Sequence, residues 1–600
     1  MTVMKLRISY FLLAGIFLLA SCEDFLQEEY LSGENSESIT SSEQTFETLV
    51  NACYITLRAF YGKENGWDLT EAGTDLYTYG LDNRSQGFTT YQNFTGAEEQ
   101  ERMNALWREL YKGLNTCNLA LRDIDEVPFS SEAVREQRRG EVAYLRAYYL
   151  WMITEIWGGV HFTTEPTQTA IHDANRTSVE TFYDQIFTDL YTAKASLPIE
   201  VGAADYGRVT RPITEAMLAR THLYRENYDS AAFYANRVIN EYNYQLLDDW
   251  SQIWDIENIQ NDEIIWAVNY SDNPVFTSAQ FKDANGDIYN TSGLIQRDGG
   301  NTGHVMWEIR YENMSWGMIR DLENGRGFQR WGPTKFFLDL YDETIDERFY
   351  GSFKHLWLSN SQTAIPKWRP FIFVDGERIT LEREKWAEPM FEVGDTAILF
   401  SKTPVPESEK AKFNPDDQFY FHPEKGYIII DINDMYLEDG SFNDAIINRQ
   451  FYFPITKKYE DDTRAELTIQ FSKRDAYVFR LSEMYLIGAE AELMRGNTGA
   501  ALELINTLRE ARSVEGQEEA MRIEASELDL DFILNERARE LATENQRFFD
   551  LKRTGTLVER VQAHNPDAAP FIQDYHALRF IPQNQLDAMF NSEGYQNPGY

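Results

Sequence analysis

The chain has 600 residues, of which 43% are hydrophobic and 26% are charged, as in an ordinary soluble protein with a large core. Its formal net charge is −41, and a surface of that sign repels phosphate backbones, so we expect no nucleic-acid partner. Aromatic residues make up 14% of the chain, a generous share. They build cores, and their flat faces can also stack on sugar rings.

The first 21 residues have the pattern of a secretory signal. Lys5 and Arg7 precede an apolar run, Tyr10–Ala20, which is too short to span a bilayer as a helix. The run leads through Leu-Ala-Ser to Cys22, which resembles the lipobox of bacterial lipoproteins, where the cysteine is acylated and becomes the new N-terminus. We therefore expect Cys22 to carry a lipid anchor, the only attachment of this protein to a membrane.

Residues 22–43 are expected to form a lipidated tether. Glu23 and Asp24 follow the cysteine, and acidic residues there resemble the signal that sends some lipoproteins to the outer face of the outer membrane. Phe25–Glu43 is polar and rich in serine, as flexible linkers are. The folded part is then expected to span residues 44–600.

Helical periodicity marks both ends of this folded part. Apolar residues at three- and four-residue spacing predict a long helix at Ser131–Trp157, apolar on nearly all sides and therefore buried. Ser131 is its expected N-cap, and Gly158-Gly159 its stop. The other predicted helices are Gln44–Tyr61, Glu98–Ile124, Val179–Leu197, Ile213–Tyr224, Ser230–Tyr242, Arg480–Met494, Thr498–Arg512 and Asp529–Arg553. Gly62–Gly96 has no helical period, and the stretch after 553 is expected to be coil.

Two of the helical pairs resemble tetratricopeptide hairpins. The helices at 213–224 and 230–242 are separated by a short turn, as are those at 480–494 and 498–512, and alanines mark where each pair can approach closely. The pairs do not follow one another at a 34-residue period. We therefore expect helical pairs dispersed within a larger fold instead of a simple repeat array.

Residues 244–473 read differently from the flanks. Short β-rich pieces alternate with long turn-rich segments. The pieces are Glu263–Asn269, Phe371–Val374, Gly426–Ile432 and Arg449–Phe453. Because no Pro/Gly/Ser-rich linker separates this region from its flanks, we predict one mainly α domain. Its helical scaffold, at 44–243 and 474–600, carries a loop-and-strand insertion at 244–473.

From end to end the chain resembles the SusD/RagB family. The resemblance rests on Cys22–Leu26, Trp107–Asn118, Glu141–Pro166, Pro333–Asp342, Arg480–Ala491, Glu536–Gly555, Ile581–Gln583 and Gln596–Tyr600. It implies a SusD-like α-helical superhelix with tetratricopeptide-like helix pairs. It also implies a non-catalytic lipoprotein on the outer face of the outer membrane, which captures a glycan and delivers it to a SusC-like TonB-dependent transporter. The alternative is a lid subunit that captures peptides or glycoprotein fragments for the same type of barrel.

The motifs of common enzyme classes are missing. The sequence holds no GxSxG, HExxH or P-loop, and its eight histidines are scattered. We expect no catalytic residue, no cofactor and no metal. Asp283–Asp287 resembles the start of a calcium loop but lacks the glycine and glutamate that such a loop needs. Cys53 and Cys117 could pair in an exported protein, although two buried free thiols are the favoured reading.

Sugar binding needs flat rings beside a few polar groups. In relatives, the loop after the first helix and the central insertion build this platform, and both regions are aromatic here. The candidate glycan-binding residues are Trp67, Tyr77, Tyr79 and Tyr91 in the loop, and Trp307, Tyr311 and Trp316 in the insertion. The insertion residues are interleaved with Asn301, Arg310, Asn313 and Arg320, and Trp331 leans towards the core. For each candidate, core packing is the alternative role.

Overall fold

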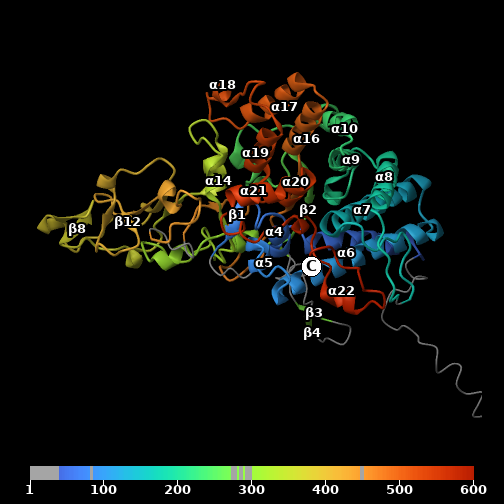
Figure 1. The fold of residues 1–600 in the computed structure, drawn as a ribbon, viewed down its shortest axis with the longest axis horizontal. Coiled ribbons are helices and arrows are strands. Elements are labelled where there is room, and N and C mark those ends of the chain that lie inside the picture. The colour runs from blue at the N-terminus through green and yellow to red at the C-terminus, as the bar shows by residue number, and fades with distance from the viewer. Residues whose placement is uncertain are drawn as a thin grey trace, which may run out of the picture.

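Helices from both ends of the chain form one body, and strands of the insertion project from it as a lobe (Figure 1). The computed structural model describes residues 40–80, 85–169, 171–271, 280–282, 288–290, 300–445 and 452–600. Cys22 and the stretch 283–287 therefore lie outside the described residues. The mainly α fold class predicted from the sequence is confirmed.

The body is centred on helix α7, Glu132–Trp157. The side chain of Ser131 accepts a hydrogen bond from the backbone N–H of Val134, as expected of an N-cap. From Gly140 to Trp157, every residue except Arg146 is buried. Gly158, with φ +73°, ends the helix, so the predicted bounds and the predicted burial are both confirmed.

Consecutive helices stack outward from α7 (Figure 1). Three helices pack on α7 itself: α3 (Glu43–Ile55), α6 (Ala97–Asp123) and α8 (Val179–Ser196). Next come the two predicted hairpins, α9 (Arg211–Tyr224) with α10 (Tyr228–Glu241), and α16 (Leu481–Met494) with α17 (Thr498–Glu510). Helix α10 packs directly on α16, where a Cβ atom at Gly488 would lie 3.7 Å from that of Ala235. Two hairpins far apart in sequence thus follow one another in space.

Shorter helices complete the helical part of the described chain. They are α4 (Glu64–Thr70), α5 (Gln86–Thr90), α11 (Trp250–Ile253), α13 (Gly303–Met306), α14 (Lys335–Asp339), α15 (Arg348–Ser352), α18 (Glu518–Met521), α19 (Leu530–Leu541), α20 (Arg547–Arg553), α21 (Leu557–His564) and α22 (Gln583–Asp587). The expectation of irregular backbone at 62–96 was therefore wrong for α4 and α5, as was that of coil after 553 for α21 and α22. Tertiary contacts stabilise α4, whose residues from Asn65 to Thr70 are all buried.

The predicted helix at 529–553 is broken in two. Between α19 and α20, Thr543 and Asn545 take positive φ values of 72° and 62°. The carboxylate of Glu71 accepts hydrogen bonds from the backbone N–H groups of Thr543 (3.1 Å) and Gln546 (3.2 Å). This buried carboxylate from a distant segment replaces the partners that a continuous helix would supply, which is why periodicity alone did not show the break.

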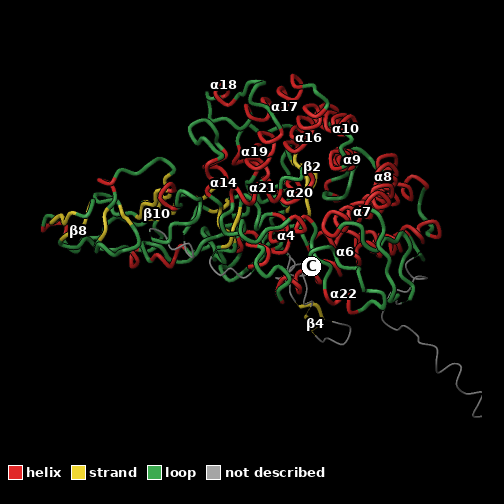
Figure 2. Tube along the Cα trace, in the orientation of Figure 1, coloured by secondary structure: helices red, strands yellow, loops and turns green. Residues whose placement is uncertain are grey.

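The lobe is built on a seven-stranded mixed sheet, in the order β7-β10-β13-β12-β11-β8-β9 (Figure 2). Its strands are β7 (Leu356–Leu358), β8 (Phe371–Val374), β9 (Glu377–Thr380), β10 (Thr396–Ser401), β11 (Ala411–Lys412), β12 (Tyr420–Phe421) and β13 (Ile428–Asp431). Pairing is antiparallel except between β10 and β13. The predicted strands at 371–374 and 426–432 are confirmed, and most of the one at 449–453 lies outside the described residues.

Two-stranded ladders within the described ranges complete the insertion and join it to its flanks. In one of them β2 (Ile264–Val268), another predicted strand, pairs with β15 (Ala476–Arg480) at the start of α16. The other ladders are β1 (Tyr77–Tyr79) with β5 (Trp331–Pro333), β6 (Phe353–Lys354) with β14 (Ile455–Thr456), and β3 (Gln280–Lys282) with β4 (Ile288–Asn290).

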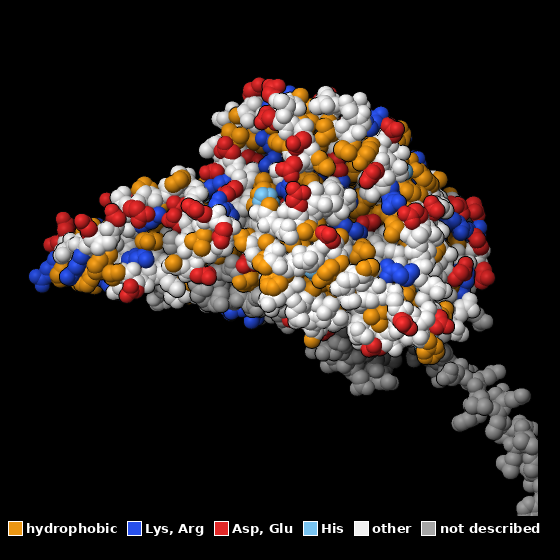
Figure 3. Space-filling model, in the orientation of Figure 1, with side chains coloured by type: hydrophobic (Ala, Val, Ile, Leu, Met, Phe, Trp, Pro, Cys, Tyr) orange, Lys and Arg blue, Asp and Glu red, His pale blue; other side chains and the backbone are white. Residues whose placement is uncertain are grey.

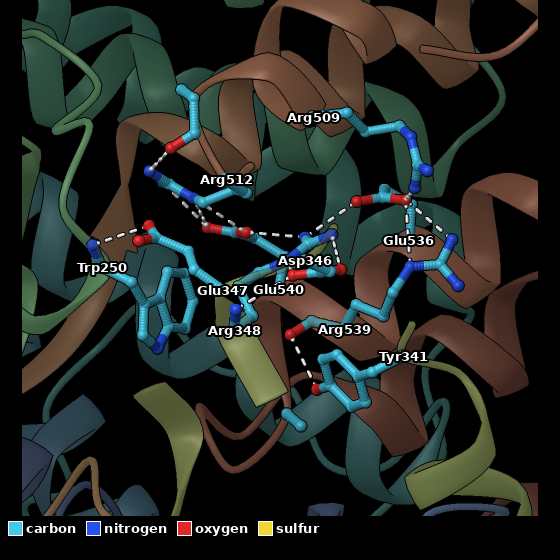
Figure 4. A network of polar contacts seen from close by, with 12 residues as sticks. Trp250, Tyr341, Asp346, Glu347, Arg348, Arg509, Arg512, Glu536, Arg539 and Glu540 are labelled. Carbon is cyan, nitrogen blue, oxygen red and sulfur yellow. Dashed lines mark hydrogen bonds and ion pairs between the residues drawn. The ribbon is translucent and has the colours of Figure 1, made fainter. Parts of the chain in front are cut away.

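A buried network of charges ties α19 to the lobe and to α16 (Figure 4). Arg348 from α15 reaches Glu536 (2.8 Å) and Glu540 (3.0 Å). Arg480 and Arg512 meet Glu540 from the other side, at 3.0 and 3.1 Å. All five side chains are fully buried, and the surrounding guanidinium groups hold the pKa values of both carboxyl groups below their usual range. Removal of any one of these charged side chains would leave a buried charge without its counter-ion.

We expect thermal stability to fall as the pH rises from about 7 to 9, a range in which the buried histidines, whose pKa values burial lowers, are mostly neutral in the folded and the unfolded chain. Burial raises the pKa values of Asp68 to about 6, Asp475 to about 7, and Glu71 and Glu308 to about 8. A carboxyl group whose pKa is raised in the folded protein contributes its full stabilisation below the pKa that it has in the unfolded chain, about 4. That contribution is lost as the pH rises through 6 to 8. The carboxyl groups of the network, whose pKa values are lowered, act in the opposite direction. Their contribution to stability is lost as the pH falls below about 4.

Melting temperatures measured at constant ionic strength from pH 4 to 9 test this profile. Glu308→Gln should flatten the decline between about pH 7 and 9, since the amide keeps an oxygen for the N–H of Ile309 and cannot ionise. A melting temperature that rises steadily from about pH 7 to 9 would contradict the expectation.

Candidate functional site

The two predicted aromatic clusters meet in space, although about 240 residues of sequence separate them. The antiparallel pairing of β1 with β5 brings the loop and the insertion together. The ring centroid of Trp307 lies 4.6 Å from that of Trp331, 4.8 Å from that of Tyr77 and 5.9 Å from that of Trp67. These rings form one core beneath the junction of body and lobe.

Five of the seven predicted glycan-binding residues are packing residues in this structure. Trp67, Tyr77 and Trp307 are at most 2% exposed, so no ring face is open to a ligand. Tyr311 is also buried, and its hydroxyl group donates to the carbonyl of Gly325 at 2.8 Å. Tyr91 is buried in a separate cluster, where its ring stacks on that of Phe94. Four of the five belong to the core beneath the junction and Tyr91 does not, and the sequence pattern did not show that these rings are buried.

Tyr79 and Trp316 remain partly exposed, and the structure does not bring them together. Tyr79 is the last residue of β1 and lies opposite Trp331. Trp316 packs against Phe413 and Phe421 of the lobe, and its indole N–H donates to the carbonyl of Gly426 at 2.8 Å. Of the polar residues interleaved with the second cluster, Asn301 is buried, Arg310 is partly exposed, and Asn313 and Arg320 are exposed. Tyr79 is the better candidate, because further aromatic and basic side chains surround its strand.

The segment Arg326–Arg330 runs beside Tyr79 and was missed in the sequence. Its backbone donates from Phe328 to the carbonyl of Val305 (2.6 Å), and the carbonyl of Arg330 accepts from Gly80 (2.8 Å). Phe328 is partly exposed, and the guanidinium carbons of Arg326 and Arg330 each lie 5.4 Å from its ring centroid. The available signal was the alternation Arg-Gly-Phe-Gln-Arg, which places both arginines and the ring on one side of an extended segment. We call Tyr79, Arg310, Arg326, Phe328 and Arg330 the rim.

Gln329 lies between the rim residues Phe328 and Arg330, and it combines a strained backbone with an incompletely hydrogen-bonded side-chain amide. Gln329 has φ +58°, is fully buried, and accepts a hydrogen bond from the backbone N–H of Arg310 at 3.3 Å. The side-chain amide nitrogen of Gln329 and Nε of Arg310 are both buried without a hydrogen-bond partner among the described residues. A Cβ atom on Gly80 would lie 2.1 Å from the carbonyl oxygen of Gln329, so only glycine fits there. Strain of this kind is often found at functional sites.

Ion pairs fix the rim to the body. Arg330 pairs with Glu64 of α4 at 2.6 Å, and Arg102 of α6 pairs with Asp68 at 2.9 Å. Asp68 also accepts from the indole N–H of Trp331 at 2.9 Å. The rim therefore stands on helices α4 and α6 and on the aromatic core, a rigid base for a binding surface.

A pocket of about 530 Å³ opens close to the rim. Glu323 and Asn324, just before Arg326, line one side, and Trp254, Lys457 and Arg474 line the other. Its size is in the range of small-ligand pockets, and its lining is mixed aromatic and polar.

Other features of the described residues bear on function. They include no cluster of three or more histidine, cysteine or acidic side chains that could hold a metal ion. Across the described ranges, no helix is both long and apolar enough to cross a membrane. Cys53 and Cys117 are both buried free thiols, the reading favoured from the sequence.

Family models match the two parts of the chain. The model described as "SusD family" matches residues 262–600, more than half of the chain, and the one described as "Starch-binding associating with outer membrane" matches residues 25–223. The chain belongs to the SusD family. This SusD-family protein is 22% identical over 593 residues to the SusD-like protein P25 of Formosa agariphila, covering 95% of this chain and 94% of that one. It is 23% identical to the SusD-like protein P38 of the same organism, covering 92% of each chain.

Solved structures share the fold of this SusD-family protein. A structure titled "Laminarin binding SusD-like protein" matches 93% of this chain and 100% of its own, with a TM-score of 0.60 and 21% identity. Surface glycan-binding protein A from Bacteroides thetaiotaomicron in complex with laminarihexaose matches 93% of this chain and 100% of its own, with a TM-score of 0.57 and 17% identity. These likenesses support the helical fold from end to end.

Proposed function

We propose that the rim binds a glycan and that the protein is a non-catalytic capture lipoprotein. The observation that carries this proposal is Phe328, partly exposed between two arginines beside Tyr79, at the junction of the two loops. Phenyl and phenol rings offer apolar faces to pyranose rings, while the guanidinium groups donate hydrogen bonds to hydroxyl groups. Because a sugar is well hydrated, such an aromatic surface is what makes its binding favourable.

Family membership and printed names support the same proposal. Two structural relatives are named for laminarin or were solved with laminarihexaose. Cys22 would anchor the protein to the outer face of the outer membrane, and the glycan would pass to a SusC-like TonB-dependent transporter. Co-purification of such a barrel with the tagged protein from its native membrane tests the partnership.

Affinity electrophoresis of residues 24–600 in gels containing single polysaccharides tests glycan binding. We expect retardation by at least one plant, microbial or host glycan, and Tyr79→Ala should reduce it severalfold because the mutant loses one ring of the rim. Tyr191→Ala is the matched control, since Tyr191 is an exposed tyrosine on α8. Migration unchanged by every glycan of the panel would contradict the proposal.

A further inference from the structure

The rim carries unpaired positive charge on a strongly acidic protein. The chain has 97 acidic and 56 basic residues, and acidic side chains are spread over the face shown in Figure 3. Arg310 and Arg326 are both partly exposed, and neither forms a salt bridge with any residue that the structure describes. The two arginines come from segments whose backbones are in contact, because a Cβ atom at Gly327 would lie 2.3 Å from the carbonyl oxygen of Ile309, and their charge on such a background needs an explanation.

Four carboxyl groups of the surrounding described segments, other than the exposed Glu323, have other partners. Glu312 pairs with Arg320, and Glu64 pairs with Arg330 and Arg102. Asp321 accepts hydrogen bonds from Asn324 and Asn360, and Glu308 pairs with Lys354. Burial also raises the pKa of Glu308 to about 8, which reduces its negative charge at neutral pH. Among the described residues, these four carboxyl groups do not neutralise the charges of Arg310 and Arg326.

Two unused donors lie next to these charges. Nε of Arg310 and the amide nitrogen of Gln329 are buried without a hydrogen-bond partner among the described residues, and a buried donor left unsatisfied destabilises the fold. One oxygen of Glu312 is buried and unpartnered as well, but the charge of Glu312 is paired with Arg320. A carboxylate or sulfate group brings two or three acceptor oxygens and a negative charge, which matches two donors next to a guanidinium group.

We infer that the glycan bound at the rim is anionic, with a carboxylate or sulfate group on its sugar rings. The partly exposed guanidinium groups of Arg310 and Arg326 pair with the anionic groups while a sugar ring lies on Phe328, and the buried side chain of Gln329 holds the backbone of Arg310 in place. The inference rests on the proposed function, since it names the class of glycan for that site. Carboxylate and sulfate offer the same chemistry, and separate probes distinguish them.

Isothermal titration of residues 24–600 with three oligosaccharides of equal length tests the inference. The probes are oligogalacturonate, a sulfated carrageenan oligosaccharide and neutral laminarin oligosaccharide, each at 50 and 300 mM NaCl. We expect one anionic probe to bind about tenfold more tightly than the neutral one, and to lose most of this advantage in high salt. Arg310→Gln and Arg326→Gln should each weaken anionic binding about tenfold and weaken neutral binding by a clearly smaller factor, because only the anionic probe loses a charge pair as well as a hydrogen bond. The control is Arg378→Gln in the lobe, whose guanidinium carbon lies 3.9 Å from the ring centroid of Phe371.

The outcomes separate the inference from the proposed function. Neutral binding as tight as anionic binding, without a salt effect, overturns the inference and leaves a glycan-binding rim in place. Failure of all three probes and of the wider gel panel overturns the proposed function and the inference with it. The anionic probe that binds more tightly identifies the charged group.

Discussion

Glu540→Gln should lower the free energy of unfolding by about 3–5 kcal/mol, although the new side chain has almost the same shape. Glu540 lies within 3.0–3.1 Å of nitrogen atoms from Arg348, Arg480 and Arg512, and all four side chains are fully buried. The substitution removes one negative charge and leaves three guanidinium groups in a medium that solvates them poorly. Chemical denaturation of the variant and the native protein measures the difference.

Glu510→Gln is the matched control for Glu540→Gln. Glu510 also pairs with an arginine, Arg522, but both side chains are exposed by more than a third. Exposed pairs contribute about 0–1 kcal/mol, so this variant should keep nearly full stability. Equal losses for the two variants would show that the buried network has no special role in joining the lobe to the body.

Trp307→Ala should cost about 3–5 kcal/mol of stability, because it removes a large buried ring. The ring lies between Trp67, Tyr77 and Trp331, and its indole N–H has no partner among the described residues, so packing is what is lost. The control is Trp386→Ala, which removes a tryptophan that is 39% exposed and should cost under about 1 kcal/mol. A Trp307→Ala protein with native stability but no glycan binding would restore Trp307 to the ligand platform.

Helices with strong periodicity were predictable within a few residues. In α7 and in the two hairpins, the spacing of apolar residues and alanines shows which side of each helix is buried, so residue spacing was enough to predict these helices. The break at 542–546 was not predictable, because its cause is the carboxylate of Glu71, which lies more than 470 residues away in sequence. Local propensity gives no information about such a partner.

The candidate site was predictable as a region and not as a set of residues. Both loops were identified, and they do meet at β1 and β5. Large rings such as those of Trp67 and Trp307 look alike in sequence whether they face solvent or a core, and their depth depends on which segments cover them. Phe328 was overlooked because the sequence does not show that its ring is partly exposed, and only the fold shows that two arginines flank that ring.

Titration of Phe328→Ala with the oligosaccharide that the native protein binds most tightly tests the central claim directly. We predict a loss of at least about tenfold in affinity, as expected when one stacking ring is removed, with an unchanged melting temperature. Trp386→Ala, which removes an exposed ring from the lobe, should bind like the native protein. Full affinity of Phe328→Ala together with lost affinity of Trp386→Ala would contradict the account and place glycan binding on the lobe.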